Sequence, residues 1–430
     1  MRRVLNMLAL TGLVLGVVSC GGGKTHPTDS RKFGERVLYD FSGGNDGAGP
    51  FGVTFDSKGN LIGTSGFIFS SSPIEIVFEL SPPAHVPDAW TETTLAAIFG
   101  ADNGISSLAI PRGGNIYGTS DSGGPGPCII PPPPGCGFVY ELSPPAAGSA
   151  SWTQTVLYGF NGGYGGAFPR GPVIFDSAGN LYGTTDTGVV FKLSPPANGS
   201  GPWNESVLSI FDTTKGQPEG VSIDSQGNLY GTTSAVALGP AASSGIVFKL
   251  SPPSGGNGLW TETVLYTFPA GVYANGGLIF DAQGNLYGTS SYGGSGFGFV
   301  FELTPSSSDA ATWTEQVLYP FSGGSDGAYP LGLIFDSSGN LYGTAGAGGD
   351  TNACVYQYPT GQSSRGCGVV FELSPNGRSW TERVLYSFTG GSDGGEPANG
   401  VIFDSSGNLY GTALGGGKGY GVAFELIPIS

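Results

Sequence analysis

A ten-residue motif recurs seven times along the chain, and no other feature constrains the fold as strongly. One of its fullest copies is FDSSGNLYGT at residues 335–344, an alternating strand, a tight turn and a second strand. Gly339 and Asn340 are expected to form the structural turn, because glycine accepts the left-handed backbone that a residue with a Cβ resists. The turn asparagines of the seven copies are Asn60, Asn115, Asn180, Asn228, Asn285, Asn340 and Asn408.

The spacing of the copies predicts a β-propeller. Successive turn asparagines lie between 48 residues apart (180 to 228) and 68 residues apart (340 to 408), which is typical of repeated blades of short strands. Each repeat holds four alternating segments, which we name A to D from the centre outward. In the sixth repeat they are residues 331–336, 340–344, 368–373 and 380–388. The expected fold is all-β, a seven-bladed propeller of four-stranded antiparallel blades.

The two ends of the repeat region predict how the ring closes. Residues 33–41 (FGERVLYDF) resemble the D segment WTERVLYSF, yet no A, B or C segment precedes them. Residues 421–426 form a C segment that no D segment follows. We therefore expect residues 33–41 to complete the last blade, which removes an open sheet edge that invites aggregation.

Composition supports a folded β-protein and limits its partners. The 430 residues include 79 Gly and 32 Pro, and 12% of them are aromatic, which a disordered chain would lack. Charged residues make up 11%, about half the usual share. The formal net charge is −16, so nucleic acids and anionic membrane surfaces are poor partners.

The N-terminus predicts export and a lipid anchor. Residues 1–19 combine Arg2 and Arg3 with an apolar run, as a lipoprotein signal peptide does. The sequence Val-Val-Ser-Cys at 17–20 resembles a lipobox, with Cys20 as the lipid attachment residue. Residues 20–32 are expected to form a flexible tether, and residues 33–430 are expected to form a single propeller domain. The expected location is extracytoplasmic, at the cell envelope, with the outer membrane favoured by Gly21. An ordinary signal peptide with an incidental cysteine is the alternative.

The other four cysteines fit an oxidising compartment. Cys128 and Cys136 bracket one loop, and Cys354 and Cys367 bracket the equivalent loop of another repeat. Three pairings are formally possible, and two local disulfides are the simplest. A zinc site is the weaker alternative, since the chain has two His and no C-x-x-C pair.

Two sets of aspartates resemble a catalytic or metal array. An aspartate at the start of a turn usually accepts hydrogen bonds from backbone amides two or three residues on, so a structural role is expected for the first set. This set is Asp56, Asp176, Asp224, Asp281, Asp336 and Asp404. The second set, in the loops between segments D and A, is Asp46, Asp326 and Asp393. These loops lack the calcium-loop spacing, so turn chemistry is expected, with weak Ca²⁺ binding as the alternative and no other cofactor.

Repeated aromatic residues suggest packing between blades. All six Trp occupy one position of segment D: Trp90, Trp152, Trp203, Trp260, Trp313 and Trp380. Segment B carries Tyr117, Tyr182, Tyr230, Tyr287, Tyr342 and Tyr410. Stacking of identical units explains both sets better than a ring of sugar-binding aromatics. Strict alternation in the sixth D segment further predicts that Trp380, Glu382, Val384 and Tyr386 share one face.

The pattern G-N-L-Y-G-T, a Gly-rich loop and G-V-V-F-E-L resembles the GloVer tandem repeat of bacterial choice-of-anchor proteins, over residues 33–426. The resemblance implies a secreted or surface-anchored β-propeller-like protein. The family offers no established activity, so no catalytic residue is carried over.

Loop variation predicts where function lies. In a propeller the D–A and B–C connections emerge on one face, and here the B–C loops vary most, whereas the A–B turns are uniform. We expect a lipid-anchored binding or scaffolding module whose variable face meets a glycan, a peptide or an envelope protein. The alternatives are a structural envelope protein without a ligand and a carbohydrate-active hydrolase or lyase. The enzyme is disfavoured because His26 lies in the tether and His85 in a C–D loop, away from any central acid–base position.

Overall fold

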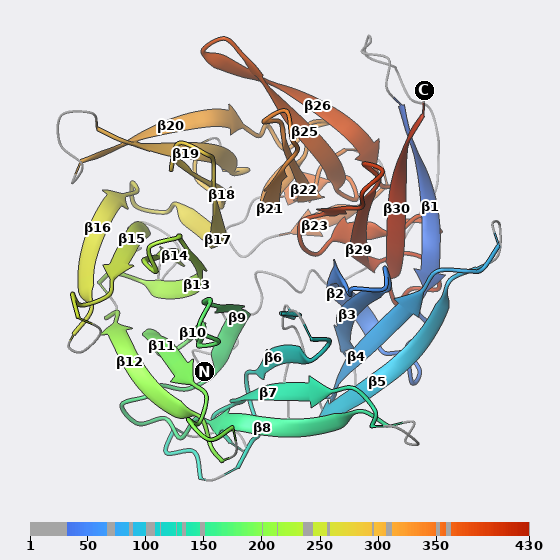
Figure 1. Cartoon of the computed structure of the whole chain (residues 1–430). Coiled ribbons are helices and arrows are strands. Elements are labelled where there is room, and N and C mark those ends of the chain that lie inside the picture. Colours follow the sequence, from blue (N-terminus) through green and yellow to red (C-terminus); the bar gives the residue numbers. More distant parts are fainter. Residues whose placement is uncertain are drawn as a thin grey trace.

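Seven antiparallel sheets stand in a ring around a central axis (Figure 1). The computed structural model describes residues 32–66, 74–85, 89–99, 108–111, 113–125, 127–130, 135–146, 151–199, 201–212, 214–234, 244–255, 259–294, 296–306, 312–349, 353–357 and 363–429. The predicted all-β propeller is confirmed. The predicted signal peptide and the predicted lipid attachment residue Cys20 lie outside these residues. None of the described residues belongs to a helix that could cross a membrane.

The strands of each blade run from the axis outward in the order A, B, C and D. The innermost strands are β2 (Ala48–Phe55), β9 (Pro169–Phe175), β13 (Gln217–Ile223), β17 (Tyr273–Phe280), β21 (Ala328–Phe335) and the short pair β27 (Gly395–Pro397) and β28 (Ile402–Phe403). The B strands are β3 (Leu61–Gly66), β6 (Ile116–Ser120), β10 (Leu181–Thr185), β14 (Leu229–Ser234), β18 (Leu286–Tyr292), β22 (Leu341–Ala347) and β29 (Leu409–Gly415). In blade 2 the bridge between Ala109 and Tyr117 takes the place of a described A strand.

The outer half of each blade is formed by strands C and D. The C strands are β4 (Ile74–Ser81), β7 (Phe138–Ser143), β11 (Val189–Ser194), β15 (Ile246–Ser251), β19 (Phe299–Pro305), β25 (Val369–Asn376) and β30 (Val422–Ile429). The D strands are β5 (Thr91–Phe99), β8 (Thr153–Gly159), β12 (Asn204–Ile210), β16 (Thr261–Thr267), β20 (Trp313–Pro320), β26 (Ser379–Ser387) and β1 (Lys32–Asp40). A small hairpin of β23 (Val355–Gln357) and β24 (Ser363–Arg365) lies in the B–C loop of blade 6.

The ring closes as the order of segments predicts. Strand β1 pairs antiparallel with β30, from Lys32 opposite Ile429 to Asp40 opposite Val422, and so supplies the D strand of blade 7 (Figure 1). The guanidinium of Arg36 donates to the carboxylate of Glu425 through Nε at 2.9 Å. The first described strand and the last thus share one sheet, and the C strand of blade 7 is not left as an open edge.

The prediction of strict alternation in the D strands is wrong at Tyr386. Val370 lies opposite Tyr386 and Phe371 lies opposite Val384, so Leu385 has no partner and forms a β-bulge. The extra residue reverses the alternation, and Tyr386 moves to the face opposite Trp380, Glu382 and Val384. An equivalent shift occurs in each of the seven C–D pairs. The bulge lets the two halves of one strand serve both neighbouring blades.

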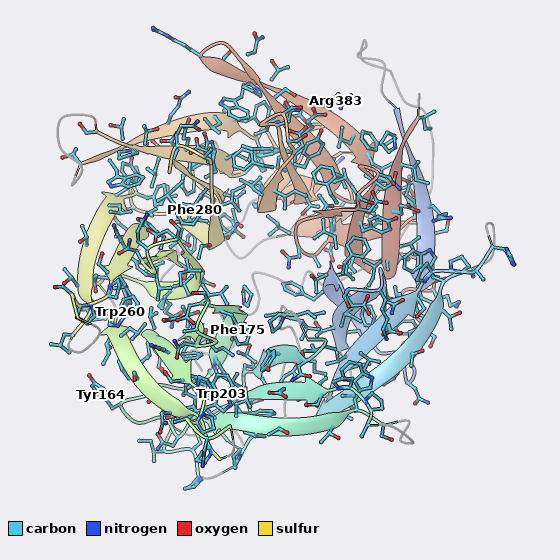
Figure 2. All side chains as sticks on the ribbon, in the orientation of Figure 1. Tyr164, Phe175, Trp203, Trp260, Phe280 and Arg383 are labelled. Atoms are coloured by element: carbon cyan, nitrogen blue, oxygen red, sulfur yellow. A yellow bond between two sulfur atoms is a disulfide. The ribbon has the colours of Figure 1, made fainter. Side chains whose placement is uncertain are left out.

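Aromatic side chains of the repeated motif join each blade to the one before it. The ring of Tyr287 in blade 5 lies edge-on to Phe335 of blade 6 at 5.0 Å, and 6.3 Å from Trp380 of blade 6. Trp90 meets Tyr410, and Trp260 meets Tyr182, in the same way at other blade boundaries. Figure 2 labels Trp203 and Trp260 beside the outer strands. Packing between blades, and not ligand stacking, explains these aromatic residues.

A glycine and a proline lock neighbouring blades together near the axis. A Cβ on Gly368, just before β25, would clash with the Pro397 ring of blade 7. The residue before that proline, Glu396, has a φ of 55° and donates its N–H to the carbonyl of Cys367 at 2.8 Å. The same contact recurs for Gly137 with Pro169, Gly298 with Pro330 and Gly421 with Pro50. We call this contact the Gly–Pro latch. The positive φ of the residue before each latch proline therefore has a structural cause.

Candidate functional site: the loop face

The alternating strand directions divide the connections between two faces of the ring. The A–B turns and C–D connections emerge on one side, which we call the turn face. The D–A and B–C connections emerge on the other side, which we call the loop face. His85 lies in the C–D connection of blade 1, on the turn face, as expected.

The aspartates of the turn face hold the turns together. Asp336 accepts hydrogen bonds from the N–H groups of Ser338 (2.8 Å) and Asn340 (2.9 Å). Its other oxygen accepts from Asn340 Nδ2 (2.7 Å) and the Tyr342 hydroxyl (3.4 Å). The backbone and asparagine contacts recur at Asp56, Asp176, Asp224, Asp281 and Asp404. Both carboxylate oxygens are thus engaged within the turn.

The aspartates of the D–A loops are held in the same fashion. Asp46 accepts from the N–H and the hydroxyl of Ser42, at 2.8 and 2.6 Å, and from the hydroxyl of Tyr39 at 3.1 Å. Burial would raise the pKa of Asp46, but these hydrogen bonds outweigh it and hold the pKa below its usual value. Asp326 and Asp393 have equivalent serine or threonine and tyrosine partners.

This arrangement bears on the predicted calcium loops. No group of three or more His, Cys, Asp or Glu that could hold a metal occurs in the described part of the chain. A Ca²⁺ ion at Asp46, Asp326 or Asp393 would compete with hydrogen bonds that already engage the carboxylates. Weak Ca²⁺ binding at these loops stays a prediction.

A second carboxyl group faces each of these aspartates from the next blade, which the sequence analysis missed. Burial and the charge of Asp326 raise the pKa of Glu382 to about 8. Burial and Asp393 likewise raise the pKa of Glu35 to about 7. At Glu92, burial raises the pKa; the hydrogen bond from Thr94 lowers it, and the charge of Asp46 raises it further. These acid pairs occupy three consecutive blade boundaries, 5/6, 6/7 and 7/1. The signal for them was the glutamate that recurs at one position of segment D, after W-T at Glu92 and Glu382 and after F-G at Glu35.

The partner of the glutamate differs where the D–A loop has no aspartate at the position of Asp46, Asp326 and Asp393. At the blade 3/4 boundary, Glu262 forms an ion pair with Lys215 at 2.5 Å and accepts from the hydroxyl of Ser209 at 2.9 Å. At the blade 2/3 boundary, the hydroxyl of Tyr158 donates to Glu205 at 3.2 Å. The glutamate position is therefore part of the blade boundary, with a partner from the D strand or the D–A loop of the preceding blade.

The two predicted disulfides are confirmed, and both cover the D–A loop of their own blade. Cys128 is bonded to Cys136 in blade 2, and Cys354 to Cys367 in blade 6. The sulfur atoms of the second pair pack over Gly390, and Cys136 Sγ packs over the equivalent Gly162. In blades 5 and 7 the rings of Phe297 and Tyr420 cover Gly323 and Gly43 in their place. A disulfide and an aromatic ring thus have the same structural role, which is to cover the glycine of the D–A loop. The disulfides also fit an extracytoplasmic protein.

Large apolar side chains are exposed on the loop face. Beside the disulfides stand Ile129, which is 69% exposed, and Val355, which is 59% exposed; each follows the first cysteine of its loop. Tyr164, in the D–A loop after blade 2, is 75% exposed. The N–H of Ile129 donates to the carbonyl of Asn161 at 3.0 Å, so the loops carrying Ile129 and Tyr164 are bonded together.

Charged groups gather on the axial side of these loops. Arg170, at the start of β9, pairs with Asp186 through Nε at 2.8 Å. Burial lowers the pKa of Arg170, but the charges of Asp186, Glu219 and Asp121 outweigh it and keep that pKa raised. These groups come from blades 2, 3 and 4, and three acids surround one cation. A small cavity of about 50 Å³ lies elsewhere near the axis, beside Phe51, Leu108 and Asn399, and suits water better than a ligand.

Comparison of sequences confirms the repeat. Residues 186–363 match the Gloeobacter/Verrucomicrobia repeat, so this part of the propeller carries that repeat. No curated protein sequence matches the chain.

Comparison of structures finds many similar chains, among which we name three. The extracellular domain described for the one-component system BT4673 of B. thetaiotaomicron is 13% identical, with a TM-score of 0.50; the match covers 91% of this chain and 39% of that one. A luciferin-regenerating enzyme is 13% identical (TM-score 0.43; 73% and 87% covered). The PQQ domain of pyranose dehydrogenase from Coprinopsis cinerea is 11% identical (TM-score 0.45; 93% and 98% covered). At such identities the likeness concerns the fold alone, and this chain spans about two fifths of the first structure.

Proposed function

We propose that this protein is an extracytoplasmic binding module whose loop face recognises a partner or ligand. The observation that carries the proposal is the contrast between the two faces. On the turn face one hydrogen-bonded turn recurs in most blades. On the loop face the connections differ from blade to blade, and exposed Ile129 and Val355 are held beside disulfides. Rigid exposed apolar groups favour binding, because little entropy is lost when they are covered.

The lipid anchor belongs to the same proposal. Cys20, once acylated, would attach the propeller to the cell envelope, with residues 20–32 as a tether. A single acyl chain binds a protein to a membrane only marginally, whereas two membrane-binding groups, such as the two chains of a diacylated cysteine, give stable attachment. The propeller would then stand at the membrane surface with its loop face open to glycans, peptides or envelope proteins.

The test is a glycan and peptide array probed with residues 31–430, which include every described strand. Retention of one ligand class, lost in a variant that carries Ile129→Ser, Tyr164→Ser and Val355→Ser together, supports binding by the loop face. A variant changed on the turn face, Lys58→Ser, is the matched control and should bind as the parent does. Absence of retention on every array, or equal binding by all variants, would overturn the proposal.

A further inference from the structure

The loops of blades 2, 3 and 4 combine an exposed apolar pair with a group of acids. We call this surface the blade 2–4 patch: Ile129 and Tyr164, with Asp121, Asp186 and Glu219 around Arg170. Asp121 directly follows β6, in the same B–C connection that carries Ile129. Arg170 follows the loop of Tyr164 by a few residues, and Figure 2 shows Tyr164 near the outer edge of the ring. The patch therefore extends from the rim toward the axis.

The apolar part of the patch is preorganised. The disulfide between Cys128 and Cys136 closes a loop with a sequence separation of 8. Ile130 and the Cys136 sulfur pack onto Gly162 of the neighbouring loop. Phe168 completes the connection by donating its N–H to the carbonyl of Cys136 at 2.7 Å. Ile129 and Tyr164 are thus presented on a fixed backbone, as anchors of a binding surface usually are.

The charge of the patch selects the kind of partner. Asp121, Asp186 and Glu219 bring three negative charges against the single positive charge of Arg170. Asp186 accepts from Arg170, and its backbone carbonyl accepts from Gln217 Nε2 at 2.6 Å, so blades 3 and 4 are joined at this point. The three carboxylates outnumber the one guanidinium, which favours a cationic group and disfavours an anionic one.

We propose that the blade 2–4 patch binds a basic, extended polypeptide segment, with an apolar side chain against Ile129 and Tyr164 and a lysine or arginine near Asp121 and Glu219. This inference rests on the proposed function and names the partner class for the loop face. The equivalent disulfide loop of blade 6 carries Val355 in the place of Ile129, and the residue equivalent to Tyr164 there is Ser392. Blade 6 is thus a natural comparison within one molecule.

The test measures binding of an acetylated ten-residue peptide of alternating Leu and Lys by calorimetry at low and physiological salt. The reference peptide has Glu in place of Lys. Ile129→Ser with Tyr164→Ser, and separately Asp121→Asn with Glu219→Gln, should each weaken binding of the Lys peptide at least tenfold. Lys58→Ser on the turn face, and Glu396→Gln on the other side of the ring, should change it by less than twofold. Unfolding midpoints equal to the parent's show that the variants are folded.

Several outcomes would overturn the inference. Equal binding of the Lys and Glu peptides removes the charge argument, and equal effects of Ile129→Ser and Lys58→Ser remove the assigned position. If the Lys peptide does not bind while the arrays retain a glycan through the loop face, this inference fails and the proposed function stands. If the arrays also retain nothing, both fail.

Discussion

Gly368 has no side chain at the point where the ring of Pro397 from the next blade crosses its backbone. The proline fits there because Glu396 before it adopts a φ of 55° and donates to the carbonyl of Cys367. Four blade boundaries in the described part of the chain use this Gly–Pro latch, and it lies directly beneath the loop face. The strained residues thus stabilise the frame that carries the candidate site.

Gly368→Ala should therefore destabilise the ring strongly. The Cβ would meet Pro397, and alanine would also resist the φ of 94°. We expect a loss of about 3 kcal/mol, from overpacking and the left-handed backbone together. Gly339→Ala is the matched control, since its φ is 85° but nothing lies near its Cβ; its cost should be about 1 kcal/mol. Equal urea midpoints for the two variants would show that the latch contributes nothing.

The acid pairs should make stability fall as the pH rises. The pKa of Glu382 is raised to about 8 and that of Glu35 to about 7 in the folded protein. Between about pH 4.5 and 8 the unfolded chain therefore releases protons that the folded chain keeps, which favours unfolding as the pH increases. Urea midpoints at pH 5, 6.5 and 8 should decrease in that order.

Glu382→Gln should flatten this dependence by an amount on the order of 1–2 kcal/mol, discounted for solvent screening. Glu262→Gln is the control, because Glu262 already has Lys215 as a cationic partner. It should leave the slope with pH in place. An unchanged slope in the Glu382 variant would contradict the acid-pair explanation.

The disulfides should stabilise their loops more than the ring. Their sequence separations are 8 and 13, so each should contribute less than the ~3 kcal/mol of a 15-residue loop. In a Cys128→Ser, Cys136→Ser variant, amide exchange should accelerate at residues 127–130 and 161–166 but not in β7 or β8. Mass spectrometry of unreduced peptides should show the two local links. Rapid exchange throughout blade 2 would contradict the local role.

The proposed lipid anchor gives a prediction independent of the fold. Cys20→Ser removes the sulfur to which a diacylglycerol group would be attached, so the protein should lose its detergent partitioning and be released from the membrane fraction. The unchanged protein, fractionated in parallel, is the reference. Partitioning of the Ser variant like the parent would rule out the lipobox at this position.

Much of the fold could be predicted because the repeat displays it seven times. A turn that needs Gly339 and Asn340, with Tyr342 after it, fixes strands A and B, and the unmatched segment at 33–41 fixes the closure. The bulge at Leu385 could not be predicted, since one extra residue in a strand leaves the apolar pattern almost unchanged. It reverses the face of Tyr386, and that reversal is what brings the tyrosine to Asp393 at 2.8 Å.

The candidate site was less accessible to sequence reasoning. The pattern indicated which face varies, but not that the disulfide of blade 2 and the ring of Tyr420 cover equivalent glycines. That equivalence depends on packing between loops from different parts of a repeat. The acid pairs could not be predicted for the same reason. Glu382 and Asp326 lie far apart in sequence and come together only when blades 5 and 6 pack against each other.

The closure by β1 leads to the last prediction. Leu38 and Phe41 are 3% and 0% exposed and pack within blade 7 and against blade 1. Deleting residues 31–41 would uncover their partners and the edge of β30. At ~1.5–3 kcal/mol for each fully buried large apolar side chain, the loss is a large part of a typical 5–15 kcal/mol stability. The truncated protein should aggregate or unfold at a lower temperature, whereas removing residues 21–30 should leave the unfolding temperature unchanged.

A circular permutant that places residues 33–41 after Ser430 through a short linker should fold normally. In this permutant the strand follows β30 in the chain and can still pair with it. If the permutant fails to fold while the 31–41 deletion stays soluble and equally stable, the ring does not depend on this strand.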